Sequence, residues 1–409
     1  MIPHPRILHV DADAFFAAVA RLVDPEGAGK ARFLIVGGSR GSRGVVCSAS
    51  WEAREFGVRS AMSIARAEKL CPQAMFVPVP GKACGIKSKE IRAALQKFTP
   101  VVEGASVDEW YLDMAGTEAV YHNEPLRVTA HRIRSTVRKE TGMSISIGGG
   151  TNKLVSKMAV ERAKPKPGTT GDGVHIVEPG TEAEFLRTFN LADIPMVGPK
   201  FQVKLSALGM VTVPDLLEHD LVALRRMLGT NAAEWLWDRA HGIAGAVVEG
   251  HGDQKSMSRD ETFSVDLSKD EDIERELLRL VTRASHDLRQ AGFTARTITV
   301  KLRDKDFKTR SARRTLVKPV VADRVIMETA KDLLHKLRGV RRVPARLIGV
   351  ALSSLAADVD ADQLNLFDND DPQLQTDRDL AIARTVDRVR KKFGSKGIIP
   401  GALVETSER

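Results

Sequence analysis

Three acidic side chains have the types and the spacing to bind a divalent metal ion. Asp108 and Glu109 are adjacent at the start of a predicted strand over residues 107–114. Two neighbouring carboxylates among residues that will be buried are costly unless a cation balances their charge. Asp11 follows residues 7–10, an apolar run typical of a strand buried on both faces. Together the three acids would offer the oxygen-rich, open site that Mg²⁺ prefers.

Other interpretations of these acids stay open at this point. Asp108 and Glu109 could form a solvated turn, and Asp11 is about as suited to cap a helix as to bind a metal. Neighbouring side chains in a regular strand point to opposite faces, so Asp108 and Glu109 can share a site only if the turn twists the backbone. Asp13 and Asp113 have no comparable argument, and we interpret both as structural.

The acids occur within longer motifs. In order along the chain these are DADAFFAAV at residues 11–19, SWEAREFGVRSAM at residues 50–62 and SVDEWYLD at residues 106–113. The three motifs together resemble the Y-family DNA polymerases, most closely the bacterial DinB (DNA polymerase IV) type, and the resemblance extends over nearly the whole chain. Any one of them alone would be a weak indication, whereas their order makes the resemblance specific.

The resemblance implies a multidomain α+β fold of the right-hand type. Such a fold has a palm with an antiparallel-rich sheet, small fingers, a helical thumb with a helix-hairpin-helix, and an α/β little finger. The boundaries that we expect are residues 1–12 and 81–169 for the palm, 13–80 for the fingers, 170–244 for the thumb, 245–257 for a linker, 258–355 for the little finger, and 356–409 for a flexible tail with a short C-terminal helix.

The same resemblance implies template-directed addition of deoxynucleotides to a primer 3′-hydroxyl. The chemistry would be phosphoryl transfer assisted by two Mg²⁺ ions. Asp11 and Asp108 would bridge both ions, Glu109 would hold the primer-side ion, and the main-chain carbonyl of Ala12 would be a further ligand. No segment suggests a proofreading exonuclease, so low-fidelity translesion synthesis in the DNA damage response is the implied role.

An aromatic pair follows the first acid. By itself the pair Phe15 and Phe16 would be interpreted as core packing. In the family the aromatic residue five positions after the first metal aspartate is the steric gate, which excludes a 2′-hydroxyl from the sugar site. That position is Phe16, and Phe15 would pack beside it.

Residues that would hold the nucleotide triphosphate are spread over the first half of the chain. The resemblance assigns Ser48, residue 51 and Arg54 to the triphosphate, and a helix beginning near residue 50 would add positive potential. The family usually has tyrosine where this chain has Trp51, whose indole can donate a hydrogen bond but cannot accept one. Lys164 is the lysine that we expect at the triphosphate, with Lys166 as a competitor because this segment has one residue more than the usual pattern.

Two segments further on indicate contacts with DNA. Residues 194–209 resemble a helix-hairpin-helix, in which Gly198 and Lys200 would bind a DNA phosphate without reading sequence. Residues 297–303 alternate strictly, which places Ile298, Val300 and Leu302 inside a sheet. Residues 296–318 contain nine Lys or Arg against two Asp, a net charge of +7 that suits phosphate contacts. The contacts that we expect from this segment are Thr297, Thr299, Lys301, Arg303, Arg310, Arg313 and Arg314.

The tail differs from the rest in composition. Residues 356–372 contain six aspartates and no Lys or Arg, which is typical of a flexible segment. Within it the segment QLNLF, residues 363–367, resembles the peptide that binds the bacterial sliding clamp. Its expected clamp-binding residues are Gln363, Leu364, Leu366 and Phe367. The last helix, around residues 382–393, has no role that the sequence reveals.

Composition agrees with this interpretation. The chain has 409 residues, with 62 Lys and Arg against 53 Asp and Glu, a net charge of +9 that favours polyanionic partners. Its three cysteines match no zinc pattern, and we expect reduced thiols. No apolar run reaches membrane-spanning length and no signal peptide is evident. We therefore expect a cytoplasmic, nucleoid-associated monomer whose partners are primer-template DNA, deoxynucleoside triphosphates and the sliding clamp, and which makes no contact with membranes.

Two rival functions were weighed. A nucleotide cyclase can use a similar palm, but it needs neither a DNA-binding thumb nor the +7 segment. A catalytically weak or dead member of the family would be an accessory DNA-binding protein, but such members typically lose the metal-binding acids, and all three are present here.

Overall fold

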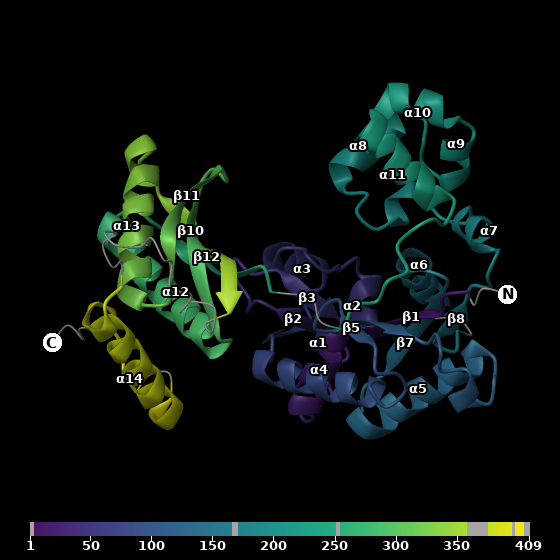
Figure 1. Ribbon diagram of the computed structural model, residues 1–409, viewed down its shortest axis with the longest axis horizontal. Helices are drawn as coiled ribbons and strands as arrows, with labels where there is room; N and C mark the ends of the chain where they lie inside the picture. Colours follow the sequence, from purple (N-terminus) through teal and green to yellow (C-terminus); the bar gives the residue numbers. More distant parts are fainter. Residues whose placement is uncertain (1–3, 166–170, 251–253, 358–374, 395–396, 405–409) are drawn as a thin grey trace, which may run out of the picture. The chain divides into compact units, whose positions relative to one another are not determined.

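The computed structural model describes residues 4–165, 171–250, 254–357, 375–394 and 397–404. The chain divides into two compact units, Met1–Gly252 and Asp253–Arg409, whose elements are labelled in Figure 1. Each unit is described by itself.

The first unit is built on a five-stranded sheet in the order β5 (Val102–Gly104), β6 (Glu109–Asp113), β1 (Ile7–Ala12), β7 (Ile145–Gly150) and β8 (Val174–Ile176). The central strand β1 runs antiparallel to both of its neighbours. This is the antiparallel-rich sheet that the resemblance implied for the palm.

The two faces of this sheet are covered differently. On one face Leu8 and Val10 of β1 share a buried core with helices α4 (Gly81–Leu95) and α5 (Leu126–Thr141). The other face lies against α6 (Lys153–Ala163). A Cβ atom on Gly148 of β7 would come within 2.2 Å of the α6 backbone, so only glycine allows α6 to lie this close. Because side chains alternate along a strand, the face under α6 is the one that receives His9 and Asp11.

A smaller sheet is inserted after β1. Its order is β3 (Val46–Ala49), β2 (Leu34–Gly37) and β4 (Met75–Pro78). Helices α1 (Phe15–Val23), α2 (Trp51–Glu55) and α3 (Ile64–Leu70) accompany it. A core with Ile35, Val46 and Ile64 holds the sheet to α2 and α3, and a second core joins Ala17 of α1 to Leu34 of β2.

The first unit ends in a group of short helices. These are α7 (Glu182–Leu186), α8 (Pro199–Ala207), α9 (Val213–Leu217), α10 (Leu221–Leu228) and α11 (Thr230–Ala240). Asp220 caps the start of α10, and Gly229, at a φ of 88°, ends it and separates it from α11. The element directly before α8 is a one-turn 3₁₀ helix at Leu191–Asp193.

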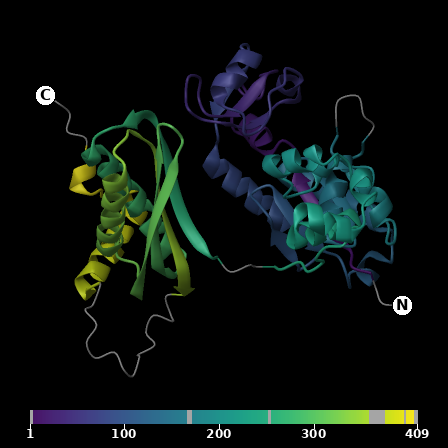
Figure 2. The same ribbon diagram turned by 90° about the horizontal axis from the view of Figure 1, so that it is seen from above.

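The second unit is a four-stranded antiparallel sheet with two helices on one side. The strand order is β11 (Thr309–Val320), β10 (Phe293–Asp304), β12 (Ala345–Ala357) and β9 (Ser256–Leu267). Helices α12 (Asp270–Gln290) and α13 (Asp323–Val340) cover one face, as Figure 2 shows. The strand β9 begins inside the segment that we expected to be a linker.

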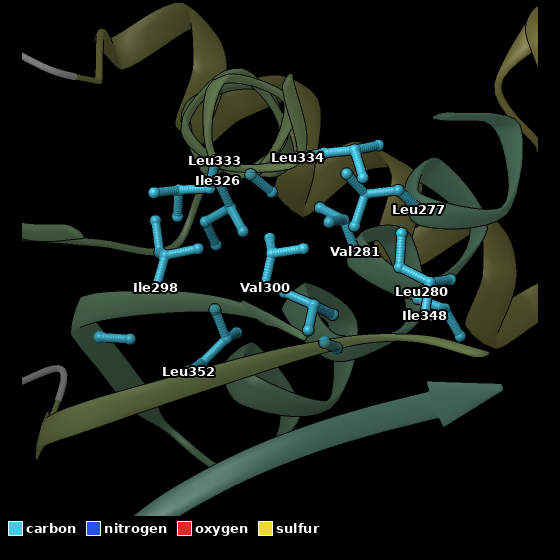
Figure 3. Close-up of a cluster of buried hydrophobic side chains, with 14 of the residues drawn as sticks. Leu277, Leu280, Val281, Ile298, Val300, Ile326, Leu333, Leu334, Ile348 and Leu352 are labelled. Atoms are coloured by element: carbon cyan, nitrogen blue, oxygen red, sulfur yellow. The ribbon is translucent and has the colours of Figure 1, made fainter. Parts of the chain in front are cut away.

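The core of this unit follows the alternation predicted from the sequence. Ile298, Val300 and Leu302 of β10 are fully buried and belong to the core of this unit. Figure 3 shows Ile298 and Val300 on the side of the sheet that faces Leu277, Val281, Ile326 and Leu333 of α12 and α13. The prediction for these three strand residues is therefore confirmed. We call the opposite face of the sheet the open face; within the described part of the second unit, α12 and α13 both pack on the other face.

The last helix, α14 (Asp377–Phe393), is anchored to the second unit rather than free. Asp387 accepts hydrogen bonds from His286 and Arg289 of α12, at 2.7 Å each. Asp379 pairs with Arg324 of α13 at 2.8 Å. Gln375 Oε1 accepts from the main-chain N–H of Val321 at 3.0 Å. Figure 2 shows the helix, in yellow, on the helical side of the sheet, so this part of the expected flexible tail is ordered and packed.

A buried carboxylate ties the hairpin end of β10 to the helices. Asp304 is fully buried and accepts hydrogen bonds from Arg310 at 3.0 Å and from Arg341 at 2.8 Å.

Removing one partner of a buried ion pair leaves charge without compensation and costs about 3–5 kcal/mol. We expect Asp304→Ala to lower the unfolding free energy of the second unit by about that amount, as measured by urea denaturation of the full chain. Asp332→Ala, which breaks an exposed pair with Arg314, should cost less than about 1 kcal/mol. Equal losses in the two variants would contradict this interpretation of Asp304.

Candidate functional site

Two of the three predicted metal-binding acids face each other across neighbouring strands. Asp11 of β1 and Glu109 of β6 are paired in register, and opposite residues of an antiparallel pair point to the same face of the sheet. That face lies under α6. Since the backbone N–H of Ala12 donates to the main-chain carbonyl of Asp108 at 2.9 Å, the third acid is held beside the same end of β1.

Asp11 is a largely buried carboxylate beside a lysine. Lys164 Nζ lies 2.9 Å from its Oδ2. Burial nevertheless raises the pKa of Asp11 to about 6, because the desolvation cost outweighs the attraction of Lys164. The negative charge at this position is therefore incompletely balanced by the protein.

Glu109 is in the opposite electrostatic situation. His9 Nε2 lies 3.6 Å from Glu109 Oε2 and Lys157 Nζ lies 2.6 Å from it. These two neighbours lower the pKa of Glu109 to about 2, so its carboxylate is ionised across the physiological range. His9 is fully buried and stacks against Tyr111 with a ring-centroid distance of 4.6 Å.

Asp108 lies just before β6 and is oriented differently. Its carboxylate accepts a hydrogen bond from Ser106 Oγ. In the part of the chain that the structure describes, no three His, Cys, Asp or Glu side chains lie close enough together to hold a metal ion. The structure thus brings Asp11 and Glu109 together and places Asp108 next to them, but it leaves the three carboxylates short of a common ligand cluster.

The donor set nevertheless fits a divalent cation. All three side chains offer hard carboxylate oxygens, which Mg²⁺ prefers, and Ala12, whose main-chain carbonyl was predicted as a further ligand, ends the same strand. The raised pKa of Asp11 has a physical cause, desolvation of its carboxylate by burial, whose cost a bound cation would offset. Asp13 and Asp113, by contrast, have structural partners: Asp13 accepts from Ser144 and Ser146, and Asp113 accepts from Ala115 N.

Lys157 is the neighbour that sequence reasoning missed. It lies on α6 with Lys153 and Lys164, which are four positions before it and seven after it. At 100° per residue the three lysines fall on one side of the helix. Each of them meets an acid of the sheet, namely Glu103, Glu109 and Asp11 respectively. This spacing was the signal that could have found Lys157.

The predicted nucleotide residues lie around the fingers. Phe16 is half-buried and meets the ring of Phe15 edge-on at 5.4 Å, whereas Phe15 itself is buried in the core. Ser48 is buried in β3. Arg54 lies with its guanidinium carbon 5.5 Å from the centre of the Trp51 ring and donates to Ala49 O.

Two details bear on the predicted triphosphate contacts. The helix expected to add positive potential, α2, has only five residues, so its dipole is weak. Lys164 is paired with Asp11 and Glu161, and Lys166 lies outside the described residues.

The strand register divides the predicted DNA contacts between the two faces of the second sheet. Arg313 is paired with Thr299 on the open face, while Arg310 and Arg314 are paired with Leu302 and Ile298 on the helical face. Arg310 donates to the buried Asp304, and Arg314 pairs with Asp332 of α13. Both arginines therefore have partners within the unit, and we remove them from the expected DNA contacts. The open face keeps Thr299, Lys301, Arg303 and Arg313. Thr297 lies on this face as well, but it is buried and its hydroxyl is hydrogen-bonded to Thr315 and Ser354.

The remaining predicted contacts are at the surface or outside the described chain. Gly198 and Lys200 are exposed at the start of α8. The predicted clamp-binding residues Gln363, Leu364, Leu366 and Phe367 lie outside the described residues. Among the described helices none is long and apolar enough to cross a membrane.

Comparison with known proteins gives consistent similarities. Residues 10–161 match the impB/mucB/samB family, and residues 254–366 match the C-terminal domain of that family. A DNA polymerase IV of Dehalococcoides mccartyi is 33% identical over 402 residues, which cover 97% of either chain. A DNA polymerase IV of Caulobacter vibrioides is 32% identical over 401 residues, 98% of this chain and 94% of the relative.

Solved structures are similar as well. DinB from Sulfolobus solfataricus is 26% identical, with a TM-score of 0.57, over 85% of this chain and 98% of that one. A Y-family DNA polymerase chimera is 24% identical and has a TM-score of 0.75, over 86% of this chain and 99% of that one. The latter likeness concerns the fold alone.

Proposed function

The chain belongs to the impB/mucB/samB family of Y-family DNA polymerases, and from this premise we propose that it extends primers by metal-assisted phosphoryl transfer. The enzyme is a DNA-directed DNA polymerase; the two-metal chemistry, the low fidelity without proofreading and a role in translesion synthesis are our proposal. The observation that carries it is the pairing of Asp11 with Glu109 across β1 and β6, with Asp108 held at the end of the same strands.

We assign the metal ligands to the three acids and one carbonyl. Both ions would be held by Asp11 and Asp108, with the main-chain carbonyl of Ala12 as a further ligand. Glu109 would hold the ion on the primer side. When bound, two Mg²⁺ ions lower the pKa of the primer 3′-hydroxyl and stabilise charge on the triphosphate and on the pyrophosphate that leaves.

The chain supplies positive charge of its own at the same place. The ammonium groups of Lys157 and Lys164 lie at the carboxylates of Glu109 and Asp11. Phosphate oxygens held beside these carboxylates would find two strong cationic donors. Ser48, Trp51 and Arg54 on the fingers side would complete the triphosphate contacts, and Phe16 would act as the steric gate under the sugar.

The open face of the second unit is the surface that we propose for the primer-template. Lys301, Arg303 and Arg313 provide positive charge, and Thr299 lies beside them on the same face. Such side chains bind phosphates without reading base sequence. Gly198 and Lys200, exposed at the start of α8, would bind a further phosphate.

Primer extension tests this proposal against the accessory-protein alternative. We expect the purified chain to extend a primer on undamaged and on damaged templates, with all four deoxynucleotides and a strict requirement for a divalent cation. A chain that binds primer-template DNA but adds no nucleotide would be the catalytically dead accessory member. Release of pyrophosphate without any DNA would indicate the nucleotide cyclase.

Clamp binding is a separate proposal with its own prediction. Burying Leu366 and Phe367 in a preformed pocket would contribute on the order of 3–6 kcal/mol before ordering costs, which leaves an affinity in the micromolar region. We expect Leu366→Ala combined with Phe367→Ala to leave single-nucleotide addition on bare DNA unchanged and to remove stimulation by the sliding clamp. Val359→Ala, an apolar change in the same acidic segment, is the control. Equal stimulation of mutant and parent would show that the segment is only a linker.

A further inference from the structure

Asp260 is an acidic side chain on the open face of the second sheet. In the register of β12, Gly349 is paired with Lys301 of β10 on one side and with Asp260 of β9 on the other. Lys301 Nζ forms an ion pair with Asp260 Oδ2 across this glycine. The pair therefore spans three strands on the surface that we propose for DNA.

The glycine makes this pair possible. A Cβ atom on Gly349 would lie 1.7 Å from Asp260 Oδ1 and 3.3 Å from Lys301 Cε. Any larger residue would have to displace the two side chains from the sheet. On the open face a carboxylate and an ammonium group thus lie together over the glycine of β12.

Other charged residues of β9 are arranged differently. Arg259 and Glu261, which flank Asp260, belong to the helical face and pair with Asp287 and Arg279 of α12. The open-face neighbours of Asp260 along β9 are Ser258 and Thr262, which carry no charge. In the paired stretch from Ser256 to Thr262 the acid on the phosphate-binding side is therefore Asp260 alone.

We propose that Asp260 competes with DNA phosphate for Lys301 and so limits the strength with which the second unit grips DNA. This inference rests on the proposed function. Both side chains of the pair are more than a third exposed, 37% for Lys301 and 39% for Asp260, so an incoming phosphate can reach and replace the carboxylate. As long as Asp260 holds Lys301, one phosphate contact is not made, which lowers affinity and favours early release of the primer-template.

The test is a double-mutant cycle on the full chain. Binding of a fluorescent primer-template is measured by anisotropy at 50 and 200 mM NaCl for the parent, Asp260→Asn, Lys301→Ala and the double variant. Asp332→Asn is the matched control, because it also removes an acid paired with a basic strand residue, Arg314, but on the helical face.

We expect Asp260→Asn to bind about three- to tenfold more tightly at 50 mM salt. The slope of log affinity against log salt should steepen by about 0.9, the value for one additional neutralised phosphate. Lys301→Ala alone should weaken binding, because it leaves the Asp260 carboxylate without its partner on the open face. The double variant, which carries neither charge, should bind no more tightly than the parent. Asp332→Asn should bind like the parent.

Three results would overturn the proposal. These are an affinity of Asp260→Asn equal to that of the parent, a double variant that binds as tightly as Asp260→Asn, and an equal gain in Asp332→Asn. A parent chain that neither binds nor extends a primer-template would instead refute the proposed function, so the two failures are distinguishable.

Discussion

Asp108→Asn should lower the rate of nucleotide addition by roughly a thousandfold or more. The neutral amide cannot balance the positive charge of Mg²⁺, so the ions that stabilise the transition state would be held more weakly. Binding of primer-template should stay near that of the parent, since the basic open face of the second unit and the start of α8 supply the phosphate contacts in our proposal. Single-turnover primer extension and anisotropy measure the two quantities separately.

A neighbouring acid provides the control for this experiment. Asp113 lies at the end of the same strand, β6, and its carboxylate accepts a hydrogen bond from Ala115 N at 2.9 Å. Asp113→Asn makes the same chemical change away from the site and should retain most of the parent rate. An Asp108→Asn enzyme that still works at a tenth of the parent rate would remove Asp108 from the metal site.

Phe16→Ala should admit ribonucleotides. A flexible apolar pocket rejects an added hydroxyl by only about a hundredfold, and a stronger gate requires a ring that cannot move aside. Phe16 is held in this way, because its ring meets Phe15 edge-on and packs against the cores of the palm and the fingers. We expect the ratio of kcat/KM for a deoxynucleotide to that for the matching ribonucleotide to fall by about a hundredfold or more, with a much smaller change for the deoxynucleotide itself.

Phe15→Leu distinguishes the loss of the gate ring itself from a general loosening of the core packing around it. Phe15 is 1% exposed and belongs to the core, so this variant perturbs the packing behind Phe16 but leaves the gate ring in place. Because Phe15 is one of the contacts that hold Phe16, discrimination should fall, but far less than in Phe16→Ala. If Phe16→Ala discriminates as well as the parent does, selectivity lies elsewhere, and Trp51 is the next residue to change.

The sequence by itself determined the features that depend on local pattern. Strand alternation predicted that Ile298, Val300 and Leu302 would be buried, and they are. The apolar run before Asp11 predicted the buried strand that became β1. Ordered motifs predicted the family, which the matches over residues 10–161 and 254–366 confirm. These predictions succeed because side-chain direction and burial in a strand repeat every two residues and are visible without knowing any partner.

Only the tertiary structure decided which residues meet across the sheets. Arg313 and Arg314 are adjacent in sequence, yet the pairing of β11 with β10 sends them to opposite faces. The position of α6 over β1 and β6 brought Lys157 and Lys164 to the acids, and the pairing of three strands brought Asp260 to Lys301 across Gly349. A shift of one residue in any of these registers would exchange the faces. Register and helix placement are set by contacts between distant parts of the chain, so no local pattern contains them.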